Sequence, residues 1–366
     1  MPCANNPNLM KTLTQMAVDV LTTADGRAKA ALSRSYAAQW QAARANGEDV
    51  VIGNVAPPDQ PARPATPALL DPRDVPSRKP GSEEGRIAIL HAVAHIELNA
   101  VDLHWDIIAR FAYAAKVCKE SGFTGVQIHG AHGYLVNQFL SPTHNQRNDQ
   151  WGGSLENRMR FVKEVYLAIR QSVGDTFPIG IKLNSADFQK GGFTQEDSME
   201  VVKHLSELGM DLIEISGGTY EAPAMMGAAQ KESTKMREAY FLTYCEEVRK
   251  RVSCPLMLTG GFRSAEGMNA ALASGACDVI GVARSLAIQP DFPNQLLSGA
   301  PVTSQVKPLT TGWKFLDKTF PLEIIWYTDQ LHLMGEGKEP NTNKSALGSV
   351  LGMVYKLGKN AVKKVR

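Results

Sequence analysis

Three side chains capable of hydrogen bonding and proton transfer follow one short apolar segment of the chain. The segment 125–130 (GVQIHG) contains His129 and is followed by His132 and Tyr134. A neutral imidazole carries one N–H donor and one acceptor nitrogen, and a phenol can donate through its hydroxyl. At the end of a buried strand, these groups would form a hydrogen-bonding cradle. A single histidine at a strand end is more often structural than catalytic, so the interpretation depends on its neighbours.

Charged and glycine-rich positions come where other apolar segments end. Lys182 lies near the end of 179–184 (IGIKLN), and two glycine-containing turns follow, Gly260-Gly261-Phe262 and Gly281-Val282-Ala283-Arg284. Glycine lets backbone N–H groups approach a phosphate closely, and arginine adds a bidentate cation. Each feature alone has a structural explanation, because Gly-Gly before a loop is often only a turn. Their repetition at the ends of successive segments favours one shared site.

The elements that must position these groups alternate between strand and helix from about residue 122 to residue 290. Continuous apolar runs predict strands, and the amphipathic stretches between them predict helices. This alternation is typical of parallel β/α units that are covered on both faces. Strands are expected at 125–130, 179–184, 212–218, 255–261 and 279–284, and helices at 154–173, 194–208, 238–252 and 265–274.

The predicted fold class is α/β, a partial TIM-type (β/α) barrel with about five recognisable strands, preceded by a helical N-terminal region. A complete barrel of this type has eight strands. VVIGNV (50–55) is the only earlier apolar run that could add one. Active sites of such barrels lie at the carboxyl ends of the strands. This is the rim at which His129, Lys182 and both glycine turns are expected to meet.

Three regions are expected along the chain. Residues 1–110 are helical with a proline-rich connector at 55–82, and 111–300 carry the barrel portion. Residues 301–366 form a C-terminal extension, in which the segment after Asn343 predicts an amphipathic helix with a basic end. A solvated, partly frayed helix is favoured there over one bound to a membrane surface or an anionic partner.

The bulk properties of the chain exclude several classes of protein. A formal net charge of +2 over 366 residues argues against nucleic acid as a main partner. No apolar run is long enough to span a membrane, and no secretory signal is visible at the N-terminus. Five scattered cysteines without a C-x-x-C pair predict reduced thiols and no zinc site. We therefore expect a cytoplasmic protein.

Across Phe111 to Pro290 the sequence resembles the second part of the barrel of the Old Yellow Enzyme family of flavin-dependent NAD(P)H oxidoreductases. The stretch 125–158 (GVQIHGAHGYLVNQFLSPTHNQRNDQWGGSLENR) carries most of the likeness. The resemblance implies FMN as cofactor and NAD(P)H as reductant. It also implies a small-molecule substrate, an enone or nitro compound, and reduction of the activated double bond of an α,β-unsaturated carbonyl compound.

The resemblance further implies roles for single residues. His129 and His132 would anchor the substrate oxygen, and Tyr134 would be the proton donor. Lys182 would face the N1/O2 edge of the flavin and stabilise its reduced form. The phosphate-binding turns would be Gly260, Gly261 and Phe262 at one strand end and Ala283 and Arg284 at the next.

The chain departs from the family's pattern in its first part. There the family supplies an apolar wall, a Thr or Cys near the flavin and a Gln at its pyrimidine edge, and none of these can be assigned. The exposed edges of an incomplete barrel would have to be covered by the N-terminal helices or by a second copy of the chain. A homo-oligomer is therefore one possible arrangement. The alternative interpretation is a truncated or fused remnant, or an assembly module without flavin.

A second resemblance covers residues 26 to 111. This part is similar to the opening half of an uncharacterised ferritin-like helical family, through HAVAHIE (91–97) and the helix around it. In ferritin-like bundles, Glu and His side chains from facing helices bind two irons. The second alternative is therefore a metal-binding protein built on Glu84, His91, His95 and Glu97. No partner helices are visible downstream, so no metal ligand is assigned.

Overall fold

The structure is a computed structural model that describes residues 11–46, 53, 55–63, 106–219, 238–299 and 301–364. The chain forms two compact units. One combines Met1–Ile128 with Asn145–Ile181, and the other combines His129–His144 with Lys182–Arg366. The region boundaries expected at 110/111 and 300/301 stay predictions.

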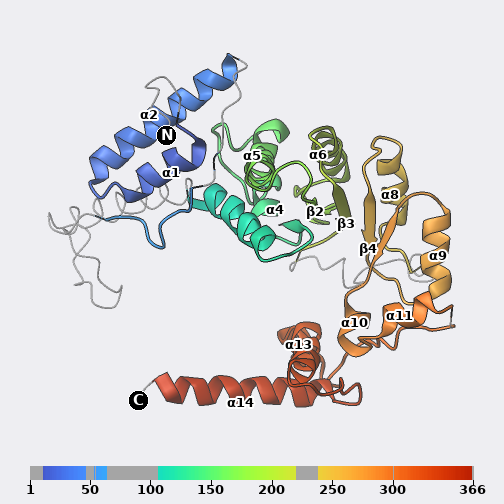
Figure 1. The fold of residues 1–366 in the computed structure, drawn as a ribbon. Coiled ribbons are helices and arrows are strands. Elements are labelled where there is room, and N and C mark those ends of the chain that lie inside the picture. The colour runs from blue at the N-terminus through green and yellow to red at the C-terminus, as the bar shows by residue number, and fades with distance from the viewer. Residues whose placement is uncertain are drawn as a thin grey trace. The chain divides into compact units, whose positions relative to one another are not determined.

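A five-stranded sheet is the central element of the described residues (Figure 1). Its strands are adjacent in chain order, and β3–β4 and β4–β5 pair in parallel, with Ile215 opposite Leu258 and Leu258 opposite Ile280. Neighbours in chain order with a helix between them form a segment of a (β/α) barrel rather than a doubly wound sheet. The predicted fold class is therefore confirmed. The strands are β1 (Val126–Gly130), β2 (Ile179–Asn184), β3 (Leu212–Ser216), β4 (Leu256–Thr259) and β5 (Val279–Gly281).

Three of the helices that lie between the strands begin at side-chain caps. Ser154, Thr194 and Ser264 each accept a hydrogen bond from a backbone N–H of the first helical turn, which has no partner within its helix. The helix expected at 238–252 is shorter than predicted, Leu242–Arg249, and Glu238 at its expected start has a φ of 58°, outside the helical region. The helices between the strands are α4 (Leu135–Leu140), α5 (Leu155–Val173), α6 (Gln195–Glu207), α8 (Leu242–Arg249) and α9 (Ala265–Ala273); α4 and α8 have no side-chain cap.

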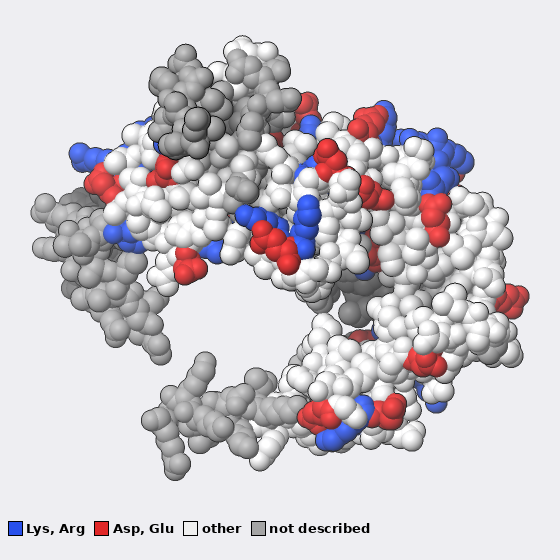
Figure 2. Space-filling model, viewed as in Figure 1, with Lys and Arg blue, Asp and Glu red and all other residues white. Residues whose placement is uncertain are grey.

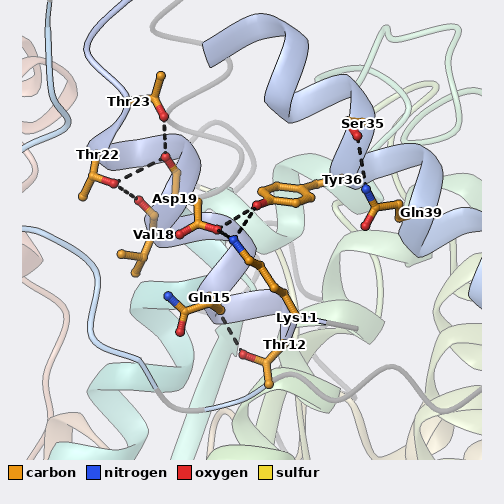
Figure 3. A network of polar contacts seen from close by, with 10 residues as sticks. All are labelled: Lys11, Thr12, Gln15, Val18, Asp19, Thr22, Thr23, Ser35, Tyr36 and Gln39. Atoms are coloured by element: carbon orange, nitrogen blue, oxygen red, sulfur yellow. Dashed lines mark hydrogen bonds and ion pairs between the residues drawn. The ribbon is translucent and has the colours of Figure 1, made fainter. Parts of the chain in front are cut away.

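The predicted N-terminal helical region is present as α1 (Leu13–Thr22) and α2 (Gly26–Ala45). Polar groups tie the two helices together at the edge of their apolar core (Figure 3). The hydroxyl of Tyr36 donates to Asp19 Oδ2 at 2.7 Å, and Lys11 Nζ donates to the same oxygen at 2.6 Å. The core of this hairpin consists of Met16, Ala17, Val20, Leu21, Tyr36 and Ala109.

The chain after β5 is helical at several places that the sequence left as mixed loops and helix. Helices α13 and α14 lie side by side, and α14 is the helix expected after Asn343 (Figure 1). On its other side, α13 contributes Trp326 and Tyr327 to a cluster with α10. These helices are α10 (Arg284–Ile288), α11 (Phe292–Leu297), α12 (Lys314–Thr319), α13 (Leu322–Gly335) and α14 (Ala346–Lys364).

Several expectations fall outside the described residues. Most of the connector 55–82 does. So does the start of the helix expected from residue 83 to about 121, whose end is described as helical at 106–120. Within VVIGNV, Gly53 and Val55 are described, and neither lies in a strand. The residues of the metal-binding alternative lie outside as well, namely Glu84, His91, His95 and Glu97.

Charged side chains are mixed on the face drawn in Figure 2. Basic and acidic groups of the described residues alternate in small clusters there, rather than forming one extended basic area. In the described ranges, no helix has the length and apolar character needed to cross a membrane.

Candidate functional site

The turn that follows β1 holds His132 in an unusual backbone conformation. Its φ is 61°, in the left-handed region that non-glycine residues rarely adopt, and Gly133 follows at 81°. The N–H of His132 donates to Asn184 Oδ1 at 3.1 Å. The N–H of Gly133 donates to Asn137 Oδ1 at 2.7 Å. Side chains from β2 and α4 thus fix the turn that carries the imidazole.

A buried carboxylate orients both of these amide side chains. Asp187 is fully buried, and its Oδ1 accepts from Asn137 Nδ2 at 3.1 Å and from Asn184 Nδ2 at 2.9 Å. Its Oδ2 accepts from the backbone N–H of Phe193 at 3.2 Å. Because the two amide nitrogens are held by Asp187, their oxygens face the N–H groups of the turn. The sequence alone did not identify Asp187 or Asn184 as residues with this role.

His129 and Tyr134 lie beside His132. The ring centroid of His129 is 5.5 Å from that of His132 and 4.8 Å from that of Tyr134. Tyr134 is 46% exposed, so a ligand can approach its side chain from outside. Burial, and then the positive charge of Lys182, lower the pKa of His129 below its ordinary value.

His132 shares a hydrogen bond with Ser216 at the end of β3. Nε2 of the imidazole lies 2.9 Å from the Ser216 Oγ. Burial first, and then the charge of Lys182, lower the pKa of His132 to about 4. The imidazole is therefore uncharged at neutral pH, with one donor and one acceptor nitrogen. If Ser216 donates to Nε2, the proton resides on Nδ1, which is then the donor available to a ligand.

Lys182 on β2 forms an ion pair with Glu214 on the neighbouring strand β3. The Nζ–Oε1 distance is 2.8 Å, and the side chains are only 19% and 7% exposed. Glu214 precedes Ser216 by two residues, so both side chains point to the same face of the strand. This period of two is the signal in the sequence that could have placed Glu214 beside the site.

One glycine turn, Gly260-Gly261, follows β4, and the other begins at Gly281, the last residue of β5. Close packing requires glycine in both turns. Gly261 has a φ of 92°, and a Cβ there would lie 2.0 Å from the carbonyl oxygen of Glu238. At Gly281 a Cβ would lie 1.8 Å from Thr259 Oγ1. The glycines thus allow the chain to pass close to its neighbours, as the predicted turns require.

An acidic side chain binds the backbone just after the first of these turns. The Glu238 carboxylate accepts from the N–H groups of Arg263 at 2.9 Å and Ser264 at 2.8 Å. Both N–H groups come at the N-terminus of α9, where the helix dipole favours negative charge. The contact shows that the backbone here is arranged to bind an anion.

Two cavities adjoin at the glycine turns. The smaller, about 70 Å³, lies between residues 259–263 and 281–285. The larger, about 610 Å³, reaches His132, Lys182 and Ser216 and is also lined by residues of α10 and α13. The residues that line both cavities are Thr259, Gly260, Ala283 and Arg284.

The predicted site residues are mostly brought together by this arrangement. His132, Lys182, Gly260, Ala283 and Arg284 line the larger cavity. The smaller cavity adds Gly261 and Phe262. Among the described residues that line either cavity, His129 and Tyr134 do not occur, and they reach the site through ring contacts next to His132. The chemical roles of all nine residues stay predictions.

Helix α13 supplies a wall of the larger cavity that the sequence did not reveal. Arg284 Nη1 donates to Glu323 Oε2 of this helix at 3.0 Å. The helical period places five cavity-lining side chains along one side of α13. These are Glu323, Ile324, Tyr327, Leu331 and Met334.

The chain belongs to the NADH:flavin oxidoreductase / NADH oxidase family, whose model matches residues 71–302. This confirms the resemblance to the Old Yellow Enzyme family. The match begins well before residue 111, where the resemblance was placed. Helices α12, α13 and α14 lie beyond its end.

Individual relatives agree with this family assignment. The chain is 38% identical over 202 residues to the NADH-dependent flavin oxidoreductase iccE of Talaromyces variabilis, covering 54% of this chain and 49% of that protein. It is 36% identical over 261 residues to the NADH-dependent flavin oxidoreductase nadA of Aspergillus parasiticus, covering 70% and 56%. It is also similar to a solved complex of 2-naphthoyl-CoA reductase with 2-naphthoyl-CoA. That structure has a TM-score of 0.51 and 31% identity, over 56% of this chain and 31% of the other. The chain thus spans about half, or less, of the length of the curated relatives it matches first.

Proposed function

We propose that the protein is an FMN-dependent NAD(P)H oxidoreductase of the Old Yellow Enzyme type that reduces the activated double bond of an α,β-unsaturated carbonyl compound. One observation carries the proposal. The predicted anchor His132, the cation Lys182 and the phosphate-turn residues Gly260, Ala283 and Arg284 line one cavity of about 610 Å³. This volume lies within the ~300–1,000 Å³ of typical cofactor and ligand sites.

The residues present fit a flavin phosphate. The smaller cavity of about 70 Å³ is several times the ~10–15 Å³ that one water requires. Its turns are free of Cβ atoms at Gly260, Gly261 and Gly281, and Arg284 provides a guanidinium. The neighbouring N–H groups of Arg263 and Ser264 already bind a carboxylate, so this backbone accommodates negative charge. Lys182 would place a positive charge at the other end of the ligand.

The proposed reaction assigns a separate task to each side chain. FMN, when bound, would supply hydride transfer from NAD(P)H to the β carbon of the substrate. His129 and His132, both uncharged at neutral pH, would donate N–H groups to the carbonyl oxygen and draw electron density from the double bond. Tyr134 would deliver its phenolic proton to the α carbon, which completes the saturated product.

The test compares Tyr134→Phe with Tyr113→Phe, a change at a tyrosine of similar exposure, 42%, that lies in the other unit. Each purified protein is mixed rapidly with NAD(P)H and then, after reduction, with 2-cyclohexenone. We expect Tyr134→Phe to slow the second half-reaction about 10²-fold or more and to leave the first nearly unchanged. Equal loss in both half-reactions would contradict the role of Tyr134, and Tyr113→Phe should match the wild type.

A second candidate function is an assembly module without flavin. It is favoured by the presence of five strands in the described part of the chain, where a complete barrel has eight. The visible spectrum of the purified protein, before and after incubation with FMN, separates the two candidates. About one FMN per chain supports the oxidoreductase, and a protein that stays colourless supports the module.

A further inference from the structure

Helix α13 brings a carboxylate to the arginine of the second phosphate turn. Arg284 Nη1 and Glu323 Oε2 are 3.0 Å apart, and both side chains are about three-quarters buried, with 24% and 25% exposed. The contact uses one nitrogen of the guanidinium, which has five N–H donors. Arg284 therefore keeps donors for a second anion, but that anion must bind close to the negative charge of Glu323.

One turn further along α13, Tyr327 has a buried hydroxyl. This hydroxyl has no hydrogen-bond partner among the described residues, and the side chain is 7% exposed. Its ring packs edge-on against Trp326 at a centroid distance of 5.0 Å. Buried polar groups in native proteins nearly always have partners, so an unpaired hydroxyl on a cavity-lining residue indicates a partner that becomes available when a ligand binds.

Three charged side chains near Tyr327 act on its pKa. Burial, and then the negative charge of Glu323, raise the pKa of Tyr327 to about 12, whereas Arg284 and Arg263 act in the opposite direction. The hydroxyl is therefore protonated at neutral pH and can act as a donor. Glu323 and Tyr327 are four residues apart on one helix, a spacing at which side chains meet.

We propose that Glu323 and Tyr327 set how strongly the site selects a phosphorylated ligand over the same ligand without its phosphate. Glu323 competes with the phosphate for Arg284. When a phosphate takes the guanidinium, the displaced carboxylate of Glu323 accepts a hydrogen bond from Tyr327. The ligand class is a phosphomonoester on a flat ring system, and the inference rests on the proposed function because it takes FMN as that ligand.

The two substitutions are expected to have opposite effects on phosphate binding. Glu323→Gln removes the competing negative charge. A phosphate then binds Arg284 without repulsion from a carboxylate, so its affinity rises. Tyr327→Phe removes the group that holds the displaced carboxylate, so Glu323 stays on Arg284 and the phosphate binds more weakly. The same change removes an unpaired buried hydroxyl, so the ligand-free protein should be as stable as the wild type or more stable.

The experiment measures binding of FMN and of riboflavin, which lacks the phosphate, to the full chain and its variants by fluorescence titration. We expect Glu323→Gln to bind FMN about 3- to 10-fold more tightly and riboflavin within about 2-fold of the wild type. We expect Tyr327→Phe to bind FMN about 2- to 5-fold more weakly, with an equal or higher Tm. The matched control is Asp329→Asn, which breaks another ion pair of α13, to Lys344 at 2.6 Å, at a residue that does not line the cavity.

The outcomes separate this inference from the proposed function. If FMN binds and Glu323→Gln leaves its affinity unchanged or lowers it, the inference is wrong and the function stands. If neither flavin binds to any variant, the function fails, and inorganic phosphate in thermal-shift titrations decides the inference. If phosphate raises the Tm of Glu323→Gln at a lower concentration than that of the wild type, the inference is supported. If both proteins respond at the same phosphate concentration, the inference is overturned. Glu323→Ala replaces Glu323→Gln if the latter does not fold.

Discussion

Replacement of Asp187 by alanine should be among the most damaging single changes in this half of the chain. The carboxylate is fully buried and accepts hydrogen bonds from Asn137, Asn184 and the backbone of Phe193. Asp187→Ala removes all three acceptor contacts at once. Because Asp187 has no exposed surface, bulk solvent does not contact the three donors that lose a partner.

The size of the effect follows from the number of donors that are left unpaired. Each buried donor without a partner costs about 1–3 kcal/mol. Three donors, with partial relaxation of the amides, give a loss of about 3–6 kcal/mol in the free energy of unfolding. That is a large part of the ~5–15 kcal/mol that stabilises a typical domain. The turn at His132 also loses the oriented amide oxygens that hold its left-handed conformation, so FMN binding should weaken as well.

Urea unfolding followed by far-UV circular dichroism measures this loss. The matched control is Asp291→Ala, at an exposed aspartate whose carboxylate accepts from Asn294 at 2.7 Å, and it should change stability by no more than about 0.5 kcal/mol. Asp187→Asn keeps one acceptor oxygen and should fall between Asp187→Ala and the wild type. A loss of less than about 1 kcal/mol for Asp187→Ala would refute the supporting role of the buried network.

Two further predictions concern the first glycine turn and the pH dependence of stability. Gly261→Ala would place a Cβ 2.0 Å from a backbone oxygen at a φ of 92°, so urea unfolding should show a loss of more than about 2 kcal/mol. Gly352→Ala, in the open on α14, should be neutral or stabilising by up to about 1 kcal/mol. The folded-state pKa of His132, about 4, lies below the ordinary value of 6.5, so the unfolded chain binds this proton first and stability should fall as the pH drops from about 6.5 to about 4. His132→Asn, which tolerates the left-handed backbone, should show a shallower fall in the urea midpoint over this range, and an equal fall would contradict the assignment.

The strands and the helices between them could be predicted because their patterns are local. The strand β2 has the bounds expected from IGIKLN, and α5 begins one residue after the expected start. Helix α13 could not be predicted, because its apolar residues surround the helix. Leu322 and Ile325 pack toward α14, whereas Ile324 lines the cavity, so no apolar stripe marks one face.

The residues of the candidate site could be predicted only where residues close to them in sequence indicate their position. The placement of Lys182 and the glycine turns follows from their positions at strand ends. The partner of Arg284 does not, because Glu323 is 39 residues away and meets it only through the packing of α13 on α10. The role of Asp187 is equally hidden, because a buried aspartate is recognised by the donors around it and not by its own sequence neighbours.

The larger cavity combines two kinds of support, and they suit different tasks. His132 and Lys182 are fixed by β strands, an ion pair and the Asp187 network, which is the rigidity that oriented proton and hydride transfer requires. The opposite wall comes from α13, beyond the segment that the family model matches, and presents flexible side chains such as Leu331 and Met334. Substitution in this wall should therefore change which ligand fits without moving the groups that are proposed to react. Under the proposed function, ligand choice would thus depend on α13, and the chemistry would depend on the strand ends.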